Sequence, residues 1–450
     1  MPRIRASLLA FLWIGSLLLP ALSACASSTA QPTTIPTPEP VLGQWTVDAN
    51  LELGAVNPLV YGVNHGPWAV ITERTLPLAQ EAGITMLRFP GGNWGDENNL
   101  QPYHIDQFAL LAEQLGAEVS LNVRLHNGTP EQAAELVRYV NLEQGYGFRY
   151  WGIGNEPTLF ATSRGDPEYG VARFNAEWRA IAEAMRAVDP DILLIGPELH
   201  QFGPDLASTP KDPFGLDWMT EFLKANGDLV DIVSIHRYPF PQGRGGRAAT
   251  IAELSTTSAE WDAIIPYLRG LIQETTGRDL PIAVTEVNSH WSNAISGEAT
   301  PDSFYNAIWW ADALGRMIRQ DVAIVNYFSL QSHPSIGGYG LFARSEPRPT
   351  YYVYRLYRQF GSQRVHAASD EARVGLYAAR RDDGALTIML INLSDEAITK
   401  PLVVEGQEPA QAELWRLDAE TPAERLPDIA FTSGAQFSLP AQSVTLVVIK

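Results

Sequence analysis

The chain of 450 residues has a single cysteine, Cys25, so no disulfide bond can form within it. It is also poor in lysine, with only Lys211, Lys224, Lys400 and Lys450. Basic residues number 32 against 51 acidic ones, and the formal net charge is −19. A surface of this sign argues against binding to nucleic acid or another polyanion and suits a neutral ligand.

Several catalytic motifs are missing. No Gly-x-Ser-x-Gly motif is present, which disfavours a serine esterase. No phosphate-binding glycine loop occurs, since Gly152-x-Gly154 lacks the third glycine and runs into Glu156-Pro157. No two histidines have metal-ligand spacing on a predicted helix, and there is no Cys/His cluster. We therefore expect neither a metal nor a cofactor.

The first residues have the pattern of a targeting signal. Arg3 and Arg5 precede an apolar stretch, 6–21, that is too short for a comfortable membrane-spanning helix. The sequence Leu22-Ser23-Ala24-Cys25 follows and resembles the lipobox of bacterial lipoproteins. We therefore expect residues 1–25 to be a lipoprotein signal peptide and Cys25 to carry a lipid. The alternative is an ordinary signal peptide that is cut nearby, with Cys25 incidental.

This reading implies a bacterial extracytoplasmic protein, lipid-anchored at the cell surface or secreted. Residues 26–41 are rich in Ser, Thr and Pro, which is typical of a stiff, solvated linker. The linker would hold the body of the protein away from the membrane.

Between residues 59 and 362, short apolar runs alternate with longer segments of helical periodicity. Helix-start signals support some of these segments, with Asp106 as an N-cap and Thr129-Pro130 as an N-cap and first helical residue. Eight such pairs in about 300 residues predict a (β/α)8 (TIM) barrel of the α/β class, with a doubly wound open sheet as the alternative. The eight apolar runs are 59–64, 85–90, 118–123, 150–154, 192–196, 229–236, 281–286 and 322–329.

After residue 362 the pattern changes to short, often alternating runs that are separated by Asp, Gly and Pro turns. This pattern predicts an antiparallel β-sandwich over residues 363–450. Residues 42–58 contain two further strand-like runs, 44–48 and 51–53, which we expect to join the sandwich. The chain would then start and finish in the same accessory domain.

Two glutamates end predicted barrel strands, Glu156 after the fourth and Glu286 after the seventh. The C-terminal strand tips are where such barrels hold their catalytic groups. A lone glutamate at a strand end usually forms a surface salt bridge. Two carboxylates in unlike environments, however, can serve as general acid and nucleophile in sugar-bond hydrolysis, and a separation of about 5–5.5 Å indicates retention of configuration.

The surrounding residues strengthen this interpretation. Asn155-Glu156-Pro157 and Thr285-Glu286 resemble the corresponding motifs of clan A glycoside hydrolases. The resemblance implies that Glu156 is the acid/base and Glu286 the nucleophile. Segments 87–93, 128–134, 150–156 and 234–238 resemble family 51 α-L-arabinofuranosidases, and segments 338–341 and 348–352 are also similar to families 39 and 79.

The chain departs from the family 51 pattern at two places. It has Thr285-Glu286-Val287-Asn288 where family 51 usually shows Asp-Glu-Trp-Asn. After the eighth strand it offers Tyr327, Phe328 and Gln331 where many clan members have a tryptophan. Both departures bear on the sugar pocket.

Roles for neighbouring residues follow from their positions. The resemblance implies that Asn155 binds the 2-hydroxyl of the sugar. Arg88 should face Glu286 and keep it anionic, and Tyr238 could donate its hydroxyl to the same carboxylate. His236 would line the pocket floor, or would be an ordinary core histidine. Further residues expected to face the ligand by location alone are Asn64, His65, Asn93, Trp94, Trp291, Tyr327 and Gln331.

Glu198 follows the fifth strand and is a third acidic residue, expected to be structural or a sugar contact. Taken together, the sequence predicts a retaining glycoside hydrolase whose partners are a carbohydrate and, through Cys25, a membrane, with no nucleic acid. An α-L-arabinofuranoside or β-xyloside is the first expectation for the substrate, followed by a uronic acid or glucan linkage. The alternative from another class is a catalytically inactive, lipid-anchored glycan-binding protein.

Overall fold

The computed structural model describes residues 39–242 and 246–450. The predicted signal peptide, Cys25 and all but the last residues of the predicted linker lie outside the described residues. Within residues 39–242 and 246–450, no helix is both long enough and apolar enough to cross a membrane.

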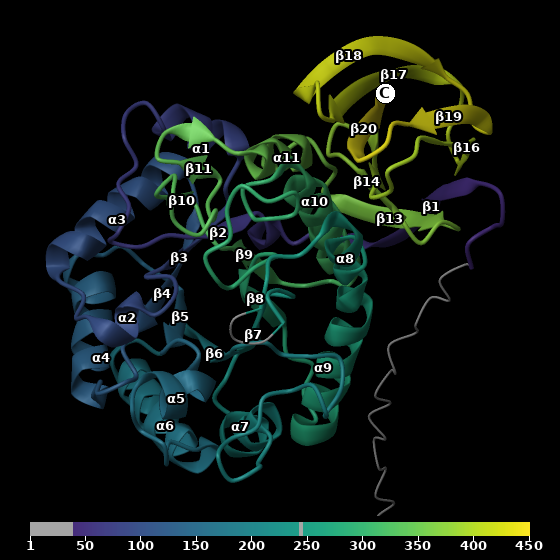
Figure 1. Cartoon of the computed structure of the whole chain (residues 1–450). Coiled ribbons are helices and arrows are strands. Elements are labelled where there is room, and N and C mark those ends of the chain that lie inside the picture. The colour runs from purple at the N-terminus through teal and green to yellow at the C-terminus, as the bar shows by residue number, and fades with distance from the viewer. Residues whose placement is uncertain (1–38, 243–245) are drawn as a thin grey trace, which may run out of the picture. The chain divides into compact units, whose positions relative to one another are not determined.

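The predicted (β/α)8 barrel is confirmed. Eight parallel strands close on one another in chain order, and helices surround them (Figure 1). The fifth predicted run extends further than expected, to Leu199, whereas the eighth is confined to Ile324–Tyr327. The barrel strands are β2 (Gly62–Asn64), β3 (Met86–Phe89), β4 (Glu118–Val123), β5 (Tyr150–Ile153), β6 (Leu193–Leu199), β7 (Ile232–Arg237), β8 (Ile282–Val287) and β9 (Ile324–Tyr327).

A typical surrounding helix buries one face, as α6 does with apolar residues every three or four positions. The expected start of α4 is confirmed, because Thr129 and Gln132 form a capping box ahead of Pro130. The expected cap at Asp106 is wrong, since α3 begins four residues earlier at Pro102 and the Asp106 carboxylate instead accepts the hydroxyls of Tyr139 and Tyr146. The helices are α1 (Leu76–Ala82), α2 (Trp94–Glu97), α3 (Pro102–Leu115), α4 (Pro130–Val137), α5 (Phe160–Ser163), α6 (Val171–Val188), α7 (Trp218–Asn226), α8 (Ile251–Leu254), α9 (Trp261–Thr276), α10 (Phe304–Arg319) and α11 (Pro349–Tyr357).

A second, mostly antiparallel sheet contains the C-terminal strands together with β1 (Trp45–Ala55), so the predicted accessory domain is confirmed. The two short runs expected near the N-terminus form this one strand, which pairs antiparallel with β13 and parallel with β16 (Figure 1). The strand order is β18-β17-β20-β15-β14-β13-β1-β16-β19. The C-terminal strands are β13 (Gln363–Ser369), β14 (Val374–Arg380), β15 (Leu386–Asn392), β16 (Ile398–Glu405), β17 (Ala410–Leu417), β18 (Pro422–Phe431), β19 (Ala435–Leu439) and β20 (Ser443–Ile449).

One face of this sheet lines a separate apolar core. Strands at both edges of the sheet contribute residues to this core. The other face packs on α10, which is buried along almost its whole length and includes Trp309 and Trp310. A polar cluster lies at this junction, where the Asp312 carboxylate accepts from Arg316 Nε at 2.7 Å and from the Tyr377 hydroxyl at 2.6 Å. Barrel and sheet therefore share a continuous interface.

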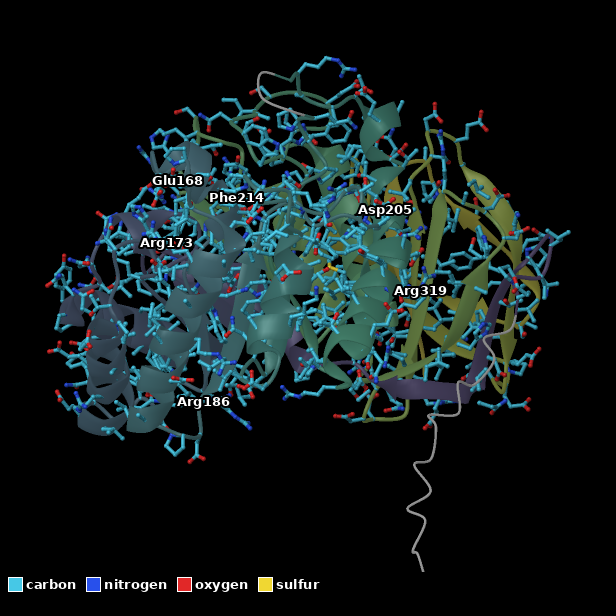
Figure 2. All side chains as sticks on the ribbon, turned by 90° about the horizontal axis from the view of Figure 1, so that it is seen from below. Glu168, Arg173, Arg186, Asp205, Phe214 and Arg319 are labelled. Atoms are coloured by element: carbon cyan, nitrogen blue, oxygen red, sulfur yellow. The ribbon has the colours of Figure 1, made fainter. Side chains whose placement is uncertain are left out.

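A small three-stranded sheet follows the last barrel strand. It consists of β10 (Gln331–Ser332), β11 (Phe342–Ala343) and β12 (Glu346–Pro347). Charged side chains such as Arg173 and Arg186 lie on the outside of the barrel helices (Figure 2). Arg173 pairs with Asp166 and Glu177 there, and such half-exposed pairs contribute little to stability.

Candidate active site

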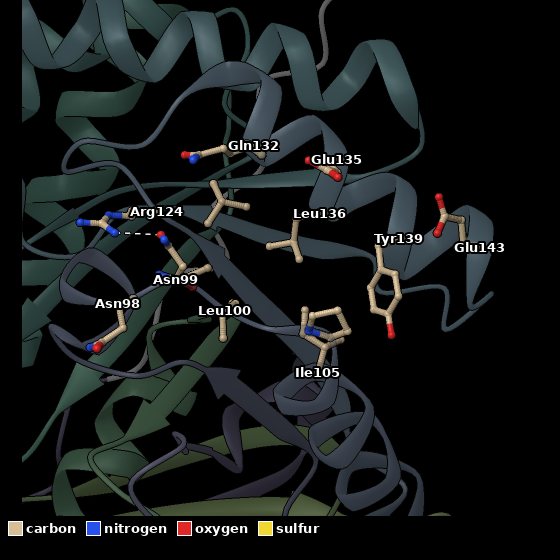
Figure 3. Close-up of a pocket in the computed structure, with 15 residues that line it drawn as sticks. Asn98, Asn99, Leu100, Ile105, Arg124, Gln132, Glu135, Leu136, Tyr139 and Glu143 are labelled. Atoms are coloured by element: carbon tan, nitrogen blue, oxygen red, sulfur yellow. Dashed lines mark hydrogen bonds between the residues drawn. The ribbon is translucent and has the colours of Figure 1, made fainter.

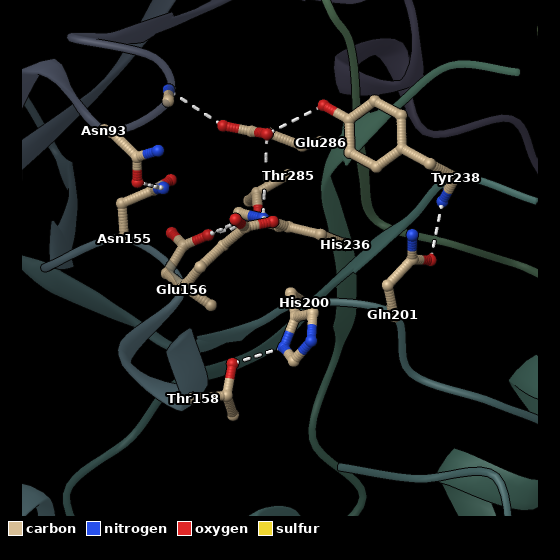
Figure 4. A network of polar contacts seen from close by, with 12 residues as sticks. Asn93, Asn155, Glu156, Thr158, His200, Gln201, His236, Tyr238, Thr285 and Glu286 are labelled. Atoms are coloured by element: carbon tan, nitrogen blue, oxygen red, sulfur yellow. Dashed lines mark hydrogen bonds and ion pairs between the residues drawn. The ribbon is translucent and has the colours of Figure 1, made fainter. Parts of the chain in front are cut away.

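The two predicted catalytic carboxylates converge where the barrel strands end (Figure 4). Glu156 follows β5, His236 lies near the end of β7, and Glu286 lies near the end of β8. One carboxylate oxygen of each glutamate and one nitrogen of His236 lie within 4.8 Å of one another. Residues that are 130 positions apart in the sequence therefore share one site.

Glu156 reaches this site through an uncommon backbone conformation. Its φ of 47° and ψ of 53° lie in the left-handed region, which costs a non-glycine residue on the order of 1–2 kcal/mol. Pro157 disfavours the right-handed helical conformation for Glu156, the residue before it. Such strained residues cluster at functional sites. The side chain is 15% exposed, so it remains open to a ligand.

Glu286 is held by three hydrogen bonds. The Gly92 amide and Arg88 Nη1 both donate to Oε1 at 2.8 Å, and the Tyr238 hydroxyl donates to Oε2 at 2.7 Å. Gly92 has a φ of 61°, a conformation that glycine adopts without strain. The contacts that the sequence predicted from Arg88 and Tyr238 are present. With both oxygens engaged, the carboxylate has a fixed orientation.

Arg88 is fully buried and contacts several residues at the centre of the site. Besides Glu286 it donates to Oδ1 of Asn64 at 2.9 Å and to Oδ1 of Asn155 at 2.8 Å, and its Nη2 lies 3.4 Å from Glu198. Burial lowers the pKa of Arg88, but the two carboxylates raise it by more. The guanidinium therefore stays charged and orders both its amide and its acidic neighbours.

His236 bridges two glutamates. Its Nδ1 lies 3.0 Å from Glu156 and its Nε2 lies 2.8 Å from Glu198, while Glu286 is 3.7 Å from Nδ1. Burial lowers the pKa of His236, but Glu286, Glu156 and Glu198 outweigh it and raise the pKa to about 9. His236 is thus neither a pocket floor alone nor an ordinary core histidine.

The contact between His236 and Glu156 lowers the pKa of Glu156, whereas it raises the pKa of His236. Burial raises the pKa of the Glu156 carboxyl, but the hydrogen bond and positive charge of His236 lower it further, and the pKa falls below its ordinary value. A general acid usually needs the reverse, a raised pKa. The location of the proton between Glu156 and His236 is therefore central to the chemistry of the site.

Glu198 has no exposed surface, so it makes no direct contact with a ligand in this structure. One of its oxygens, Oε2, accepts the Thr285 hydroxyl and faces His236 and Arg88. The other, Oε1, has no hydrogen-bond partner among the residues that the structure describes. The sequence leaves two roles open for Glu198, a structural residue or a sugar contact. Because Glu198 is buried, it can act here only by supporting the residues that face the ligand.

Several residues of the site were not anticipated. Asp96 is buried, and its carboxylate accepts the backbone amides of Leu125, His126 and Asn155 at 2.8 to 2.9 Å. After β6, His200 bonds Thr158, which lies two residues beyond Glu156. The sequence does contain a signal for His200, because polar residues follow a buried strand there. For Asp96 there is none, since nothing in the sequence distinguishes it from its neighbour Glu97.

Some residues predicted by location do contribute, in supporting positions. Asn64 accepts from Arg88 and donates to the Thr285 carbonyl at 2.9 Å. Asn93 accepts from Asn155 Nδ2 at 3.2 Å. The Trp291 side chain, after β8, is anchored through Nε1 to the Pro241 carbonyl while 40% of the residue stays exposed. An anchored, exposed indole ring can stack on a sugar.

Two other residues that the sequence predicts to face the ligand, His65 and Trp94, pack against aromatic rings. His65 is buried near Phe89 and Phe108, and burial lowers its pKa to about 4. Trp94, on α2, packs edge-on against His104. Neither ring contacts a residue of the Glu156–Glu286 cluster through a hydrogen bond among the described residues.

Tyr327 and Gln331 also lie outside the cluster. Side chains alternate between the inside and the outside of a barrel strand, and Tyr327 is on the outside, where its hydroxyl accepts from Asn306 and its ring packs on Trp310. Gln331 donates to the Arg344 carbonyl at 2.7 Å near the small sheet. The expectation that Tyr327 faces the ligand is therefore wrong for this structure, because a one-residue change of position reverses the direction of a side chain.

The group formed by Glu156, His236 and Glu286 also has donor atoms that could hold a metal ion. Arg88, however, places a buried positive charge 2.8 Å from Glu286 Oε1. A second cation at that oxygen would be repelled in a site of low dielectric constant. The arrangement therefore fits an uncharged organic ligand between the carboxylates better than a metal.

A separate cavity of about 370 Å³ lies beside α3 and α4 (Figure 3). Ile105 and Leu136 provide apolar lining, and Arg124 donates to Asn99 Oδ1 at 2.8 Å along its edge. No residue of the Glu156–Glu286 cluster lines it. The cavity is therefore distinct from the candidate active site.

Comparison with known proteins gives relatives of one broad class. No family model matches the chain. Endoglucanase A of Paenibacillus lautus is 27% identical over 397 residues, covering 74% of this chain and 53% of the relative. The intracellular exo-α-(1→5)-L-arabinofuranosidase of Streptomyces lividans is 26% identical over 266 residues, covering 44% of this chain and 37% of the relative. The chain thus spans about half or less of the length of these curated relatives.

Solved structures share the fold. The α-L-arabinofuranosidase of Thermotoga maritima, in complex with arabinose, superposes with a TM-score of 0.71 at 18% identity, over 90% of this chain and 99% of that one. The resemblance to glycoside hydrolases is confirmed. Glycoside hydrolases named for arabinofuranosides and for glucans both occur among the relatives, so the similarity does not single out the family 51 pattern.

Proposed function

We propose that this chain is a retaining glycoside hydrolase that uses Glu156 as acid/base and Glu286 as nucleophile. The observation that carries the proposal is the convergence of the two carboxylates, with oxygens no more than 4.8 Å apart. Retaining enzymes hold their carboxyl groups about 5–5.5 Å apart, whereas inverting enzymes need about 6.5–9.5 Å to admit a water molecule. The short separation favours attack by a carboxylate over attack by water.

In the first step, a Glu286 oxygen forms a bond to the anomeric carbon as the bond to the leaving oxygen breaks. Glu156 gives its proton to that oxygen, so the departing sugar or alcohol leaves neutral. In the second step, Glu156 takes a proton from water, the water oxygen bonds to the anomeric carbon, and Glu286 departs as a carboxylate. Two inversions give net retention.

Asn155 is positioned to assist both steps. Its Oδ1 is fixed by Arg88, and its Nδ2 has a second N–H beyond the one directed at Asn93. This N–H can donate to the hydroxyl next to the anomeric carbon, a contact that strengthens in the transition state. The fixed amide costs little reorganisation when the substrate binds.

For the substrate we propose a neutral polysaccharide or its oligosaccharides, with α-L-arabinofuranosidic or β-xylosidic bonds first. The relatives named as arabinofuranosidases support this choice, and the relative named as an endoglucanase supports a glucan as the alternative. A uronic acid linkage is disfavoured by the net charge of −19.

A panel of nitrophenyl glycosides tests the proposal. We expect turnover of at least one arabinofuranoside, xyloside or glucoside, and loss of at least 10³-fold in kcat for Glu286→Ala. Adding azide to Glu286→Ala should restore turnover and yield a glycosyl azide of inverted configuration. Tight glycan binding without turnover by the wild-type chain would instead indicate a non-catalytic glycan-binding protein.

We also propose that the chain is exported and lipid-anchored at Cys25. The sequence Leu22-Ser23-Ala24-Cys25 behind an apolar stretch supports this. Mass spectrometry of the membrane fraction should find an acylated N-terminal Cys25, and Cys25→Ser should release the protein from membranes. Recovery of the unmodified wild-type chain from the soluble cytoplasmic fraction would refute the proposal.

A further inference from the structure

The His236 ring lies between two carboxylates, and this fixes how many protons the group holds. Nδ1 is 3.0 Å from Glu156 and Nε2 is 2.8 Å from Glu198. A neutral imidazole has one N–H, so it can donate to only one of them. Either His236 is charged and donates to both, or one carboxyl group holds a proton and donates to the ring.

Glu198 is the less suitable holder of that proton. It has Arg88 Nη2 at 3.4 Å and accepts the Thr285 hydroxyl on the same oxygen that faces His236. Burial raises the pKa of Glu198, but Arg88 and His236 lower it further, and the net shift is downward. Glu198 therefore stays ionised and accepts from Nε2. The second proton lies between Nδ1 and Glu156.

We propose that Glu198 is a positioning residue for the acid/base: it holds His236 with its Nε2–H directed at Glu198, so that Nδ1 and Glu156 share the proton that Glu156 delivers. This inference rests on the proposed function of Glu156. Glu198 itself touches no ligand, because it has no exposed surface and lies behind His236.

The shared proton reconciles the low pKa of Glu156 with an acid role. In the free site the proton resides on His236, whose charge is balanced by Glu198 and by Glu286 at 3.7 Å. A bound sugar excludes water and disfavours the separated charges, so the proton moves to Glu156 and His236 becomes neutral. After Glu156 has protonated the leaving oxygen, His236 keeps only its Nε2–H, and Glu156 is a free carboxylate that can accept a proton from water.

Other charged and titratable groups also face this pair. Glu286 and Arg88 face His236 from β8 and β3, His200 faces Glu156 from just after β6, and Tyr238, just after β7, interacts with both Glu156 and Glu286. Replacing Glu198 by glutamine removes one negative charge and keeps the shape of the side chain. The proton affinity of the Glu156–His236 pair should then fall.

The first test is the pH dependence of kcat/KM for Glu198→Gln on an aryl glycoside. We expect the alkaline limb to move to lower pH by one unit or more, because the pair loses its shared proton more readily. Asp312→Asn is the matched control, since Asp312 is also a buried carboxylate bonded to an arginine but lies at the junction of barrel and sheet. It should lower stability and leave the pH limbs in place. An unmoved alkaline limb in Glu198→Gln would overturn the proposal.

The second test needs no turnover. NMR titration of histidine side chains in the full chain, with the His236 signal assigned from its loss in His236→Asn, should give a pKa at least one unit lower in Glu198→Gln than in the wild type. An equal pKa in both would overturn the proposal. A shifted titration in a chain that cleaves no glycoside would refute the proposed hydrolase function alone.

A further variant covers the case in which Glu198→Gln does not fold. Glu198→Asp keeps the charge but draws the carboxylate away from Nε2. Its His236 pKa should fall by half a unit or more, and its alkaline limb should move in the same direction. Values equal to those of the wild type would refute a positioning role for Glu198.

Discussion

Tyr238 provides one of the three hydrogen bonds that orient Glu286, and it is the one most easily removed. Tyr238→Phe deletes only the hydroxyl that donates to Oε2 at 2.7 Å. We expect kcat to fall about 10- to 100-fold, since a preorganised donor at a reacting oxygen is typically worth that much or more. The thermal midpoint should change by only a few degrees. Steady-state kinetics on an aryl glycoside would measure the effect, and an unchanged kcat would show that Arg88 and Gly92 suffice.

Arg88 should matter for folding as well as for chemistry. Arg88→Met leaves Glu198 and Glu286 buried without the guanidinium that faces both of them. Removing one partner of a buried ion pair costs about 3–5 kcal/mol. Urea unfolding at pH 7 should show this loss. The exposed pair of Arg74 and Glu346 offers a control, because Arg74→Met should change the free energy of unfolding by less than about 1 kcal/mol. Equal losses in both variants would contradict the assignment.

At the scale of elements, the short helix α2 holds together the loops that carry the site. Its Asp96 carboxylate accepts one amide from each of Leu125, His126 and Asn155, which follow β4 and β5. An asparagine there presents only one acceptor oxygen and adds an N–H that no neighbouring amide can accept. Asp96→Asn should therefore lower stability by about 2–4 kcal/mol.

The same change should reduce activity, because the Asp96 carboxylate accepts the backbone amide of Asn155. Displacement of the Asn155 amide moves Glu156, the next residue, and misplacement of about 1 Å can cost on the order of 100-fold in rate. Kinetics and urea unfolding of the variant would measure both effects. Glu97→Gln, on the same helix but exposed, is the control and should change neither by much.

The elements were also the scale at which the sequence was most informative. Hydrophobic runs located all eight barrel strands, and the ends of two of them located Glu156 and Glu286, because parallel strands bring their C-terminal ends to one rim. What failed was side-chain direction near the ends, as at Tyr327, where a shift of one residue reverses the face. Asp96 could not be found, since its importance lies in accepting backbone amides, which leave no pattern in a sequence.

For the whole molecule, three buried histidines shape the dependence of stability on pH. Burial lowers the pKa of His65 and of His290 to about 4, and the balance at His236 raises its pKa to about 9, all from an ordinary 6.5. Between pH 6.5 and 4 the unfolded chain binds more protons at His65 and His290, so stability is lost as the pH falls. Between pH 6.5 and 9 the folded chain binds more at His236, so stability is lost as the pH rises.

We therefore expect the contribution of these histidines to be most favourable near pH 6.5. Urea unfolding from pH 5 to pH 9 would measure it. His65→Phe should weaken the decline on the acid side, and His236→Asn should weaken the decline on the alkaline side. Parallel curves for the variants and the wild type would contradict the two assignments.

The position of β1 has a consequence for how the protein is made. This strand is translated before the barrel, yet its neighbours β13 and β16 begin at Gln363 and Ile398, so more than 300 residues must emerge from the ribosome before it can pair. A nascent chain can assemble its catalytic rim while Trp45 and Val47 still lack their final surroundings. Pairing across such a separation is slow and leaves strand edges open to misassembly. One of the last events of folding should therefore be the pairing of this earliest strand with β13 and β16, which are made more than 300 residues later.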